Sequence, residues 1–122
     1  MLNILKNNLG VMQGRLLPKY RGSYQAHPVD YWRDEFEIAK KFELDYIEFI
    51  LDYEDAFYNP LLKNGGPEEI LEICEKTGVS IKTICADYFM DAPLHSENKS
   101  VVSESLNILN KLLETSKKIG VT

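Results

Sequence analysis

The sequence predicts an α/β fold in which parallel strands alternate with outer helices, and three observations lead to this prediction. Three runs rich in β-branched and aromatic residues have the length of strands. Each run is followed by a polar loop and then by a segment whose apolar residues recur every three or four positions. The junctions from the helical segments into the next strands share one form. Strand–helix alternation of this kind implies parallel pairing through right-handed crossovers.

The expected strands cover residues 9–13, 45–51 and 79–86. The first helix is expected from Asp30, a residue type that commonly caps helices, to about residue 42. Its apolar face is made of four residues at helical spacing, which are Trp32, Phe36, Ala39 and Phe42.

The second helix is expected to begin at Gly66–Pro67, because proline is favoured at the first helical position. It is expected to end at Thr77–Gly78, because glycine is a common C-terminal cap. The third helix is expected from residue 98 or 100 to residue 119. Its apolar stripe is predicted to consist of Leu106, Leu109 and Leu113.

The repeated junctions indicate a fold with more than three strands. Residues 40–45 lead into the second strand, residues 75–80 lead into the third, and residues 117–122 have the same form. We therefore expect the first residues of a fourth strand at the end of the chain. Residues 1–122 are interpreted as the first three βα units of a (β/α)8 TIM barrel, the N-terminal part of a single domain truncated before strand four.

A doubly wound domain of similar length is the alternative architecture, but it needs about five strands. Three parallel strands alone leave two edges of the sheet unpaired. These edges provide a route to a homo-oligomer.

The composition argues against several classes of function. The 122-residue chain has a formal net charge of −5 and an isoelectric point near 5.0, so we expect no nucleic-acid partner. No apolar run reaches the roughly 18 residues that a membrane span needs, so we expect no membrane partner. Cys74 and Cys85 lack metal-ligand spacing and are interpreted as reduced thiols of a cytoplasmic protein.

Functional residues are expected at the carboxyl ends of the strands, where both βα barrels and open α/β sheets form their sites. Gln13 and Arg15 follow the first strand, and strand alternation places them on one face. Glu48 lies within the apolar run of the second strand, where a carboxylate needs a partner. We interpret Glu48 as a substrate-binding or acid-base carboxylate. The alternative is a structural glutamate that is paired with a neighbouring Arg or Lys or is solvated at an edge of the sheet.

Asp87 is the candidate at the third strand. It alternates with Thr83 and Cys85, so period-two geometry places these three residues on one face. That face points into the barrel mouth if Ile84 packs on the helices. The alternative is an aspartate that caps the following loop.

The loop from residue 15 to residue 29 is a candidate phosphate-binding segment. Residues 1–29 hold four basic residues and no acidic one, whereas the remainder holds ten basic and nineteen acidic residues. Arg and Lys side chains bind phosphate, and aromatic rings pack against sugars. Arg15 is the better candidate and Lys19 the second. Residues 52–55 match no calcium-binding spacing and are interpreted as a solvated acidic loop.

Three segments together resemble the sugar phosphate isomerase/epimerase family: GVMQGRL at 10–16, YIEF at 46–49 and TICADYF at 83–89. That family has a xylose isomerase-like (β/α)8 barrel. The likeness is strongest to members of the hexulose-6-phosphate isomerase and ribulose-phosphate 3-epimerase types. The resemblance implies a sugar phosphate as the small-molecule substrate and proton transfer through an enediolate.

The resemblance also implies a divalent metal, Mn or Mg, in the full-length protein. In this family the metal ligands and the two catalytic glutamates come from later strands. No catalytic or metal-binding residue is therefore assigned within this chain, and the chain alone is expected to bind no metal and to be inactive. The resemblance places Glu48 and Asp87 only on the substrate side of the site, and Gln13 and Arg15 are the other substrate-binding candidates.

Two other functions stay open. One is a non-catalytic module that binds a sugar phosphate or completes a barrel by association. The other is a relative of the abasic-site endonucleases, which place metal-binding histidines at the ends of early strands. The third strand here ends in Asp87–Tyr88 without such a histidine, which weakens the endonuclease hypothesis.

Overall fold

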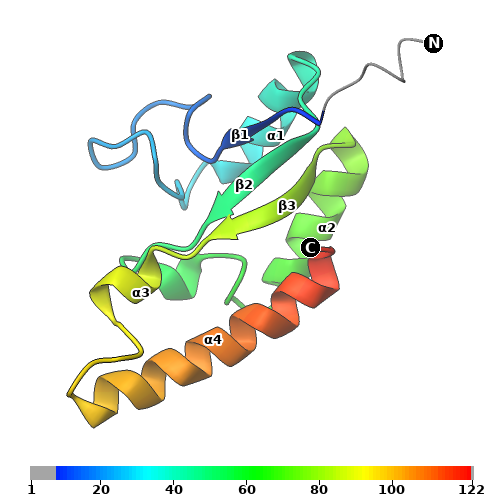
Figure 1. Ribbon diagram of the computed structural model, residues 1–122. Helices are drawn as coiled ribbons and strands as arrows, with labels where there is room; N and C mark the ends of the chain where they lie inside the picture. Colours follow the sequence, from blue (N-terminus) through cyan, green and yellow to red (C-terminus); the bar gives the residue numbers. More distant parts are fainter. Residues whose placement is uncertain (1–7, 122) are drawn as a thin grey trace.

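The computed structural model describes residues 8–121 and contains one parallel three-stranded sheet in the order β1-β2-β3. The strands are β1 (Gly10–Met12), β2 (Tyr46–Ile50) and β3 (Ser80–Cys85) (Figure 1). The predicted α/β class and the parallel pairing are confirmed. The arrangement is consistent with part of a TIM-barrel-like fold.

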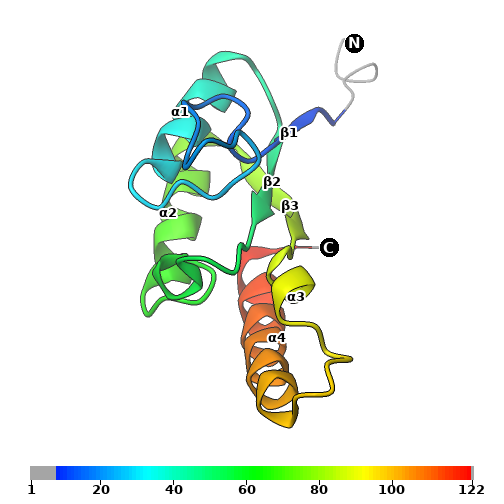
Figure 2. The same ribbon diagram turned by 90° about the vertical axis from the view of Figure 1, so that its left-hand side faces the viewer.

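Helices connect the strands, and α1 and α2 lie together on one face of the sheet (Figure 2). Among residues 8–121 no helix packs on the opposite face, which we call the open face. The helical elements are α1 (Trp32–Lys41), the 3-10 helix η2 (Ala56–Tyr58), α2 (Gly66–Thr77), α3 (Tyr88–Asp91) and α4 (Lys99–Ile119).

The register of the sheet decides which side chains reach the open face. Ile47 pairs with Ile81, but Glu48 pairs with Thr83, so Lys82 is an extra residue in β3. Beyond this bulge Glu48 and Thr83 lie on the open face, whereas Ile84 packs against the core. The predicted orientation of Ile84 is confirmed.

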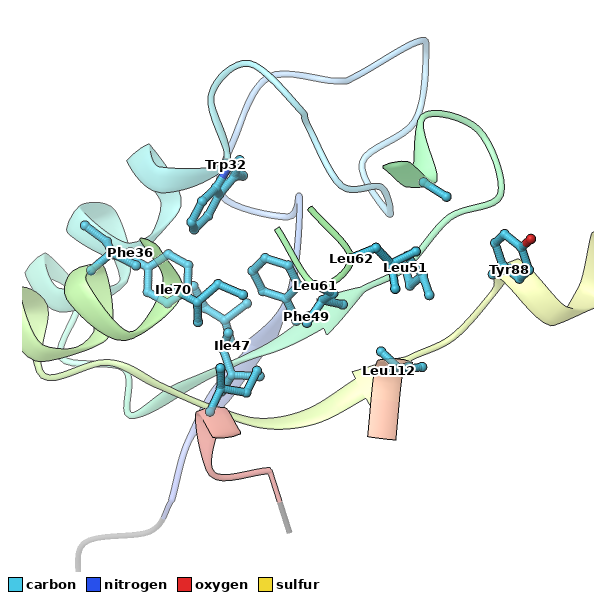
Figure 3. Packing of buried hydrophobic residues seen from close by; sticks show 14 of the residues in the cluster. Trp32, Phe36, Ile47, Phe49, Leu51, Leu61, Leu62, Ile70, Tyr88 and Leu112 are labelled. Carbon is cyan, nitrogen blue, oxygen red and sulfur yellow. The ribbon is translucent and has the colours of Figure 1, made fainter. Parts of the chain in front are cut away.

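The core lies between the sheet and the helices. Trp32 of α1, Ile70 of α2 and Phe49 of β2 gather in this layer (Figure 3), and all three are buried. The rings of Trp32 and Phe49 meet edge to face with centroids 5.7 Å apart. Burial of apolar surface here fixes α1 and α2 on one face and leaves the other face available for polar groups.

The first helix starts near Asp30 as predicted, but the assignment of Asp30 as its N-cap is wrong. The helix begins at Trp32 after Tyr31, which makes no capping hydrogen bond through its side chain, and Asp30 is exposed. A turn closed by the Tyr31 N–H on the Pro28 carbonyl precedes the helix and displaces its start. The predicted apolar face is confirmed for Trp32, Phe36 and Ala39, which are buried. Phe42 lies beyond the helix and is exposed.

The bounds of α2 are confirmed. Pro67 occupies its first turn, and Gly78 ends it in the left-handed conformation at φ 76°. The Gly78 N–H donates to the Cys74 carbonyl at 2.8 Å.

The start of α4 is confirmed, but its predicted apolar face is wrong. The Asn98 side chain accepts hydrogen bonds from the Ser100 and Val101 N–H groups. Leu106 is 47% exposed and Leu113 is 58% exposed. The buried face instead consists of Ser105, Ile108, Leu112, Thr115 and Ile119.

Two hydroxyl groups explain which face of α4 is buried. Ser105 donates to the Ala92 carbonyl at 2.8 Å, and Thr115 donates to the Leu61 carbonyl at 2.8 Å. Each buried hydroxyl is thus paired, and each satisfies a loop carbonyl as well.

The expected fourth strand is not formed at Val121, and Thr122 lies outside the described residues. Gly120 ends α4 at φ 83°. In the described part of the chain no helix combines the length and the apolar character that a membrane crossing requires.

Candidate functional site

The three strands end at one edge of the sheet, which we call the carboxyl edge. Backbone bonds continue the pairing past the strand ends, because the Leu51 N–H donates to the Cys85 carbonyl at 3.0 Å. The Tyr88 N–H then donates to the Leu51 carbonyl at 2.9 Å. The loops that follow the strands are therefore held together, and their polar side chains meet there.

Glu48 and Thr83 form a polar pair on the open face. The Thr83 hydroxyl donates to Glu48 Oε1 at 3.1 Å. Glu48 is only partly buried and has no cationic partner among the salt bridges of residues 8–121. An ion pair is therefore not observed for Glu48 among these residues, whereas the alternative of a solvated glutamate stays open, because the side chain is partly exposed.

Asp87 lies on the same side as its predicted neighbours. The Cys85 thiol donates to Asp87 Oδ1 at 3.3 Å, so these two side chains lie together, although the strand ends at Cys85 and strand alternation does not extend to Asp87. Burial, and then the hydrogen bond to Asp87, raise the pKa of Cys85 to about 11, so the thiol stays protonated. Asp87 precedes α3 but makes no capping hydrogen bond with its side chain, so the capping alternative is not observed.

Gln13 joins the ends of β1 and β2. Its side-chain Oε1 accepts the Ile50 N–H at 2.8 Å, and its own N–H donates to the Glu48 carbonyl at 2.9 Å. Gln13 is fully buried, and its Nε2 has no hydrogen-bond partner in the described part of the chain. A buried amide donor without a partner is uncommon in folded proteins.

The predicted common face of Gln13 and Arg15 is wrong. The strand ends at Met12 and a turn follows, closed by the Arg15 N–H on the Met12 carbonyl. Strand alternation therefore does not apply, and Arg15 is exposed whereas Gln13 is buried.

Glu35 holds this turn in place, and sequence reasoning missed it. Its buried carboxylate accepts the Gly14 N–H at 2.8 and 2.9 Å and the Leu16 N–H at 3.1 Å. Burial raises the pKa of Glu35, and the two backbone donors oppose the rise. The available signal was its helical spacing with Trp32 and Phe36, which puts a carboxylate on an apolar face.

The two predicted phosphate-binding residues are accessible. Arg15 Nη2 contacts Gln25 Oε1 at 3.4 Å, and Lys19 Nζ lies 5.1 Å from the ring centre of Tyr24. Neither forms a salt bridge within residues 8–121.

Arg21, by contrast, is already paired, because its guanidinium lies 2.6 Å from Glu54 and 2.7 Å from Asp55. The interpretation of residues 52–55 as a solvated acidic loop is therefore incomplete. Asp52 is half-buried, and its Oδ2 accepts the His27 N–H at 3.1 Å. Burial raises the pKa of Asp52, and the nearby charges of Asp87, Asp91 and Glu54 raise it further.

A pocket of about 250 Å³ lies between the loop after β1 and the loop after β2. Asp52 and His27 both line it. His27 was not singled out in the sequence, because a lone loop histidine carries no signal of burial.

The described residues do not fit the divalent metal that the family resemblance implies. Among residues 8–121 no three His, Cys, Asp or Glu side chains lie close enough together to hold a metal ion. Metal sites of this kind take several carboxylate or imidazole ligands. No metal-dependent step is therefore derived from these residues.

Comparison with protein-family models gives no match for this chain. Comparison with curated proteins finds similarity to L-ribulose-5-phosphate 3-epimerases. The chain is 28% identical over 93 residues to the probable L-ribulose-5-phosphate 3-epimerase UlaE of Mycoplasma pneumoniae, which covers 74% of this chain and 30% of that protein. It is 26% identical over 93 residues to the L-ribulose-5-phosphate 3-epimerase UlaE of Escherichia coli, with 74% and 32% covered. The chain thus spans about a third of the length of the curated relatives that it matches.

Proposed function

We propose that this chain forms the first three βα units of a (β/α)8 barrel whose complete form isomerises or epimerises a sugar phosphate. The observation that carries the proposal is the similarity over 93 residues to L-ribulose-5-phosphate 3-epimerases. The parallel sheet supports it, because barrels of this architecture form their sites at the carboxyl ends of the strands. In this proposal the chain supplies the substrate-binding wall of the site, which consists of Gln13, Arg15, Lys19, Glu48 and Asp87.

The residues of this wall have complementary chemistry. Arg15 and Lys19 are exposed cations without salt-bridge partners in the described chain, so each can bind a phosphate group. Within residues 8–121, Glu48 and Asp87 each accept one hydrogen bond from a side chain, and their other lone pairs can accept sugar hydroxyl groups. The buried Gln13 Nε2 is a spare donor beside them.

The role assigned to this chain is binding and orientation rather than proton transfer. No side chain in residues 8–121 is assigned as the acid or base of the reaction. The expected Mn or Mg ion and the catalytic glutamates belong in this proposal to the part of the enzyme beyond these residues. The chain alone is therefore expected to bind a sugar phosphate without converting it.

The test is the affinity of the 122-residue chain for L-ribulose 5-phosphate, measured by calorimetric titration. We expect Arg15→Ala and Lys19→Ala each to weaken binding several-fold, because each removes a charge-assisted hydrogen bond to phosphate. Lys41→Ala is the matched control, since Lys41 is exposed at the end of α1, where the chain enters the opposite edge of the sheet. Equal affinities for all three variants would refute the assigned phosphate site.

A further inference from the structure

The pocket between the two loops lies outside the substrate-binding wall proposed above. His27 and Tyr20 line it from the loop after β1, Asp52 and Tyr53 from the loop after β2, and Asp91 from the end of α3. Its volume of about 250 Å³ suits a ligand much smaller than a drug molecule. The contacts of its lining residues indicate what kind of ligand that is.

His27 is the unusual residue of this pocket. It is 4% exposed, and neither ring nitrogen has a hydrogen-bond partner in the described part of the chain. Its ring is held between Trp32 and Phe49, with centroid distances of 6.0 and 5.2 Å. Burial lowers the pKa of His27 to about 3, so the ring is neutral and offers one donor and one acceptor. Unpaired buried groups of this kind are rare and favour an incoming polar partner.

The charges around the pocket argue against a phosphate group. Asp52, Glu54 and Asp91 contribute carboxylates, whereas the one cationic side chain that lines the pocket is Arg21. The Arg21 guanidinium is already bound to Glu54 and to Asp55. A phosphate would therefore be repelled, but carboxylates accept hydrogen bonds readily from neutral hydroxyl groups.

Two tyrosines complete a lining that is typical of sugar binding. Tyr20 and Tyr53 line the pocket, and Tyr53 is held against Tyr88 with ring centroids 5.2 Å apart. Aromatic faces pack against the carbon–hydrogen side of a sugar, while carboxylates accept its hydroxyl groups. The ring nitrogens of His27 are covered, so a ligand reaches them only when the pocket wall yields. Ser23 and Gln25 are the exposed residues of that wall. Ser23 exchanges two backbone hydrogen bonds with Tyr20, and the Gln25 side chain contacts Arg15 Nη2 at 3.4 Å, so an outward movement of this wall breaks these contacts.

We propose that this pocket binds the uncharged, hydroxyl-rich end of a sugar, with His27 and Asp52 hydrogen-bonded to its hydroxyl groups. Arg15 stands at the rim of the pocket through its contact with Gln25, so the phosphate of the same ligand lies outside the pocket, at Arg15. The inference rests on the proposed function for the choice of sugar. It places the hydroxyl groups of the sugar at His27 and Asp52 instead of at Glu48 and Asp87, keeps the phosphate at Arg15, and names two specificity-determining residues.

The experiment is a nuclear magnetic resonance titration of the ¹⁵N-labelled 122-residue chain, which follows the ring nitrogens of His27. The ligands are L-ribulose, L-ribulose 5-phosphate and inorganic phosphate. We expect both sugars to shift the His27 resonances and inorganic phosphate to leave them unchanged. His27→Phe preserves the ring packing and removes both nitrogens, so it should weaken L-ribulose binding by about tenfold, the effect of one good hydrogen bond.

Asp52→Asn provides a second variant, because it keeps the shape and one oxygen for the His27 N–H while it removes the charge. We expect it to weaken L-ribulose binding as well. Asp34→Asn is the matched control, since Asp34 is exposed in the first turn of α1 and does not line the pocket. Undiminished sugar binding by folded His27→Phe or Asp52→Asn would overturn the inference, and so would occupation of the pocket by inorganic phosphate.

The two proposals fail in different ways. If L-ribulose 5-phosphate shifts the resonances of Glu48, Thr83 and Asp87 but not those of His27, the pocket inference fails and the proposed function stands. If L-ribulose shifts His27 while L-ribulose 5-phosphate leaves the carboxyl edge unchanged, the pocket binds sugar and the proposed function fails.

Discussion

Glu35 is the side chain that most directly fixes the loop carrying the proposed phosphate-binding residues. Glu35→Ala leaves the N–H groups of Gly14 and Leu16 without their acceptor. We expect a loss of about 2 to 4 kcal/mol in the free energy of unfolding, measured by urea denaturation. Glu37→Ala, an exposed position on the same helix, should change it by less than about 0.5 kcal/mol. Equal losses in the two variants would contradict the role of Glu35.

Gly14 is needed at its position for two separate reasons. Its φ of 96° is unfavourable for residues with a side chain, and an added Cβ would lie 1.7 Å from the Tyr24 carbonyl oxygen. Gly22 has a similar φ of 80°, but nothing lies within 4 Å of its Cβ position. Gly22→Ala should therefore cost about 1 kcal/mol of the free energy of unfolding, from backbone strain alone.

Gly14→Ala should cost at least about 3 kcal/mol, because the backbone must also move away from Tyr24. Thermal and urea unfolding of both variants measure the difference. A smaller loss in the free energy of unfolding for Gly14→Ala than for Gly22→Ala would contradict the close approach of Gly14 to Tyr24.

His27 makes stability depend on pH. Its pKa is lowered from 6.5 to about 3 by burial, so the unfolded chain binds more protons between these values and stability falls as the pH falls through this window. Between about pH 7 and about pH 5 the contribution is a loss of about 2 kcal/mol. His27→Phe should lack this loss while it keeps the contacts with Trp32 and Phe49.

Urea denaturation of wild type and His27→Phe at both pH values measures this change in the free energy of unfolding. The carboxylates that both proteins share contribute equally to the change, so their contribution cancels when the two proteins are compared. His95→Phe serves as the matched histidine control, because His95 is exposed in the loop before α4. The same pH dependence in wild type and His27→Phe would show that His27 does not titrate as a buried group.

At the scale of elements, the buried face of α4 is not the face that apolar periodicity predicts. Leu112 is buried in the core, whereas its neighbour Leu113 is 58% exposed. Leu112→Ala should lower the free energy of unfolding by about 2 to 4 kcal/mol, and Leu113→Ala by less than about 1 kcal/mol. Urea denaturation gives both values. A larger loss for Leu113→Ala than for Leu112→Ala would support the buried face that was expected from Leu106, Leu109 and Leu113.

The same helix shows why the sequence does not decide every face. It carries two apolar stripes, and the buried one includes Ser105 and Thr115, which look polar until their loop partners are known. The strands were more predictable, because alternation within β3 places Thr83 on one side and Ile84 on the other. Strand alternation ends at Met12, so the predicted common face of Gln13 and Arg15 beyond it was wrong.

Candidate site residues followed the same division. Glu48 and Asp87 could be proposed because a carboxylate at the end of an apolar strand is visible in the sequence, and their role in a site stays a prediction. Glu35 and His27 were missed because their partners lie in segments distant along the chain. Glu35 binds N–H groups 19 and 21 residues away, and the His27 N–H binds a carboxylate 25 residues away. Such contacts depend on tertiary packing, which periodicity does not report.

For the whole molecule, the arrangement of polar groups is asymmetric. Apolar burial lies on the side of α1 and α2, and the open face carries Glu48 and Thr83 without a covering helix among residues 8–121 (Figure 2). A parallel sheet is normally covered on both faces, so we propose that further strands or another copy of the chain cover the open face. Association through the unpaired edges stays a prediction, as does completion of a barrel.

The central claim is that the carboxyl edge of this sheet binds a sugar phosphate. The most direct measurement is a map of backbone amide shifts in the ¹⁵N-labelled chain during titration with L-ribulose 5-phosphate. The predicted result is a set of shifts confined to the strand ends and their loops, including Arg15, Glu48 and Asp87, with the amides of Lys40 and Lys41 at the end of α1 unchanged. The claim would be contradicted if the spectrum showed no saturable shifts, or shifts at the opposite edge only.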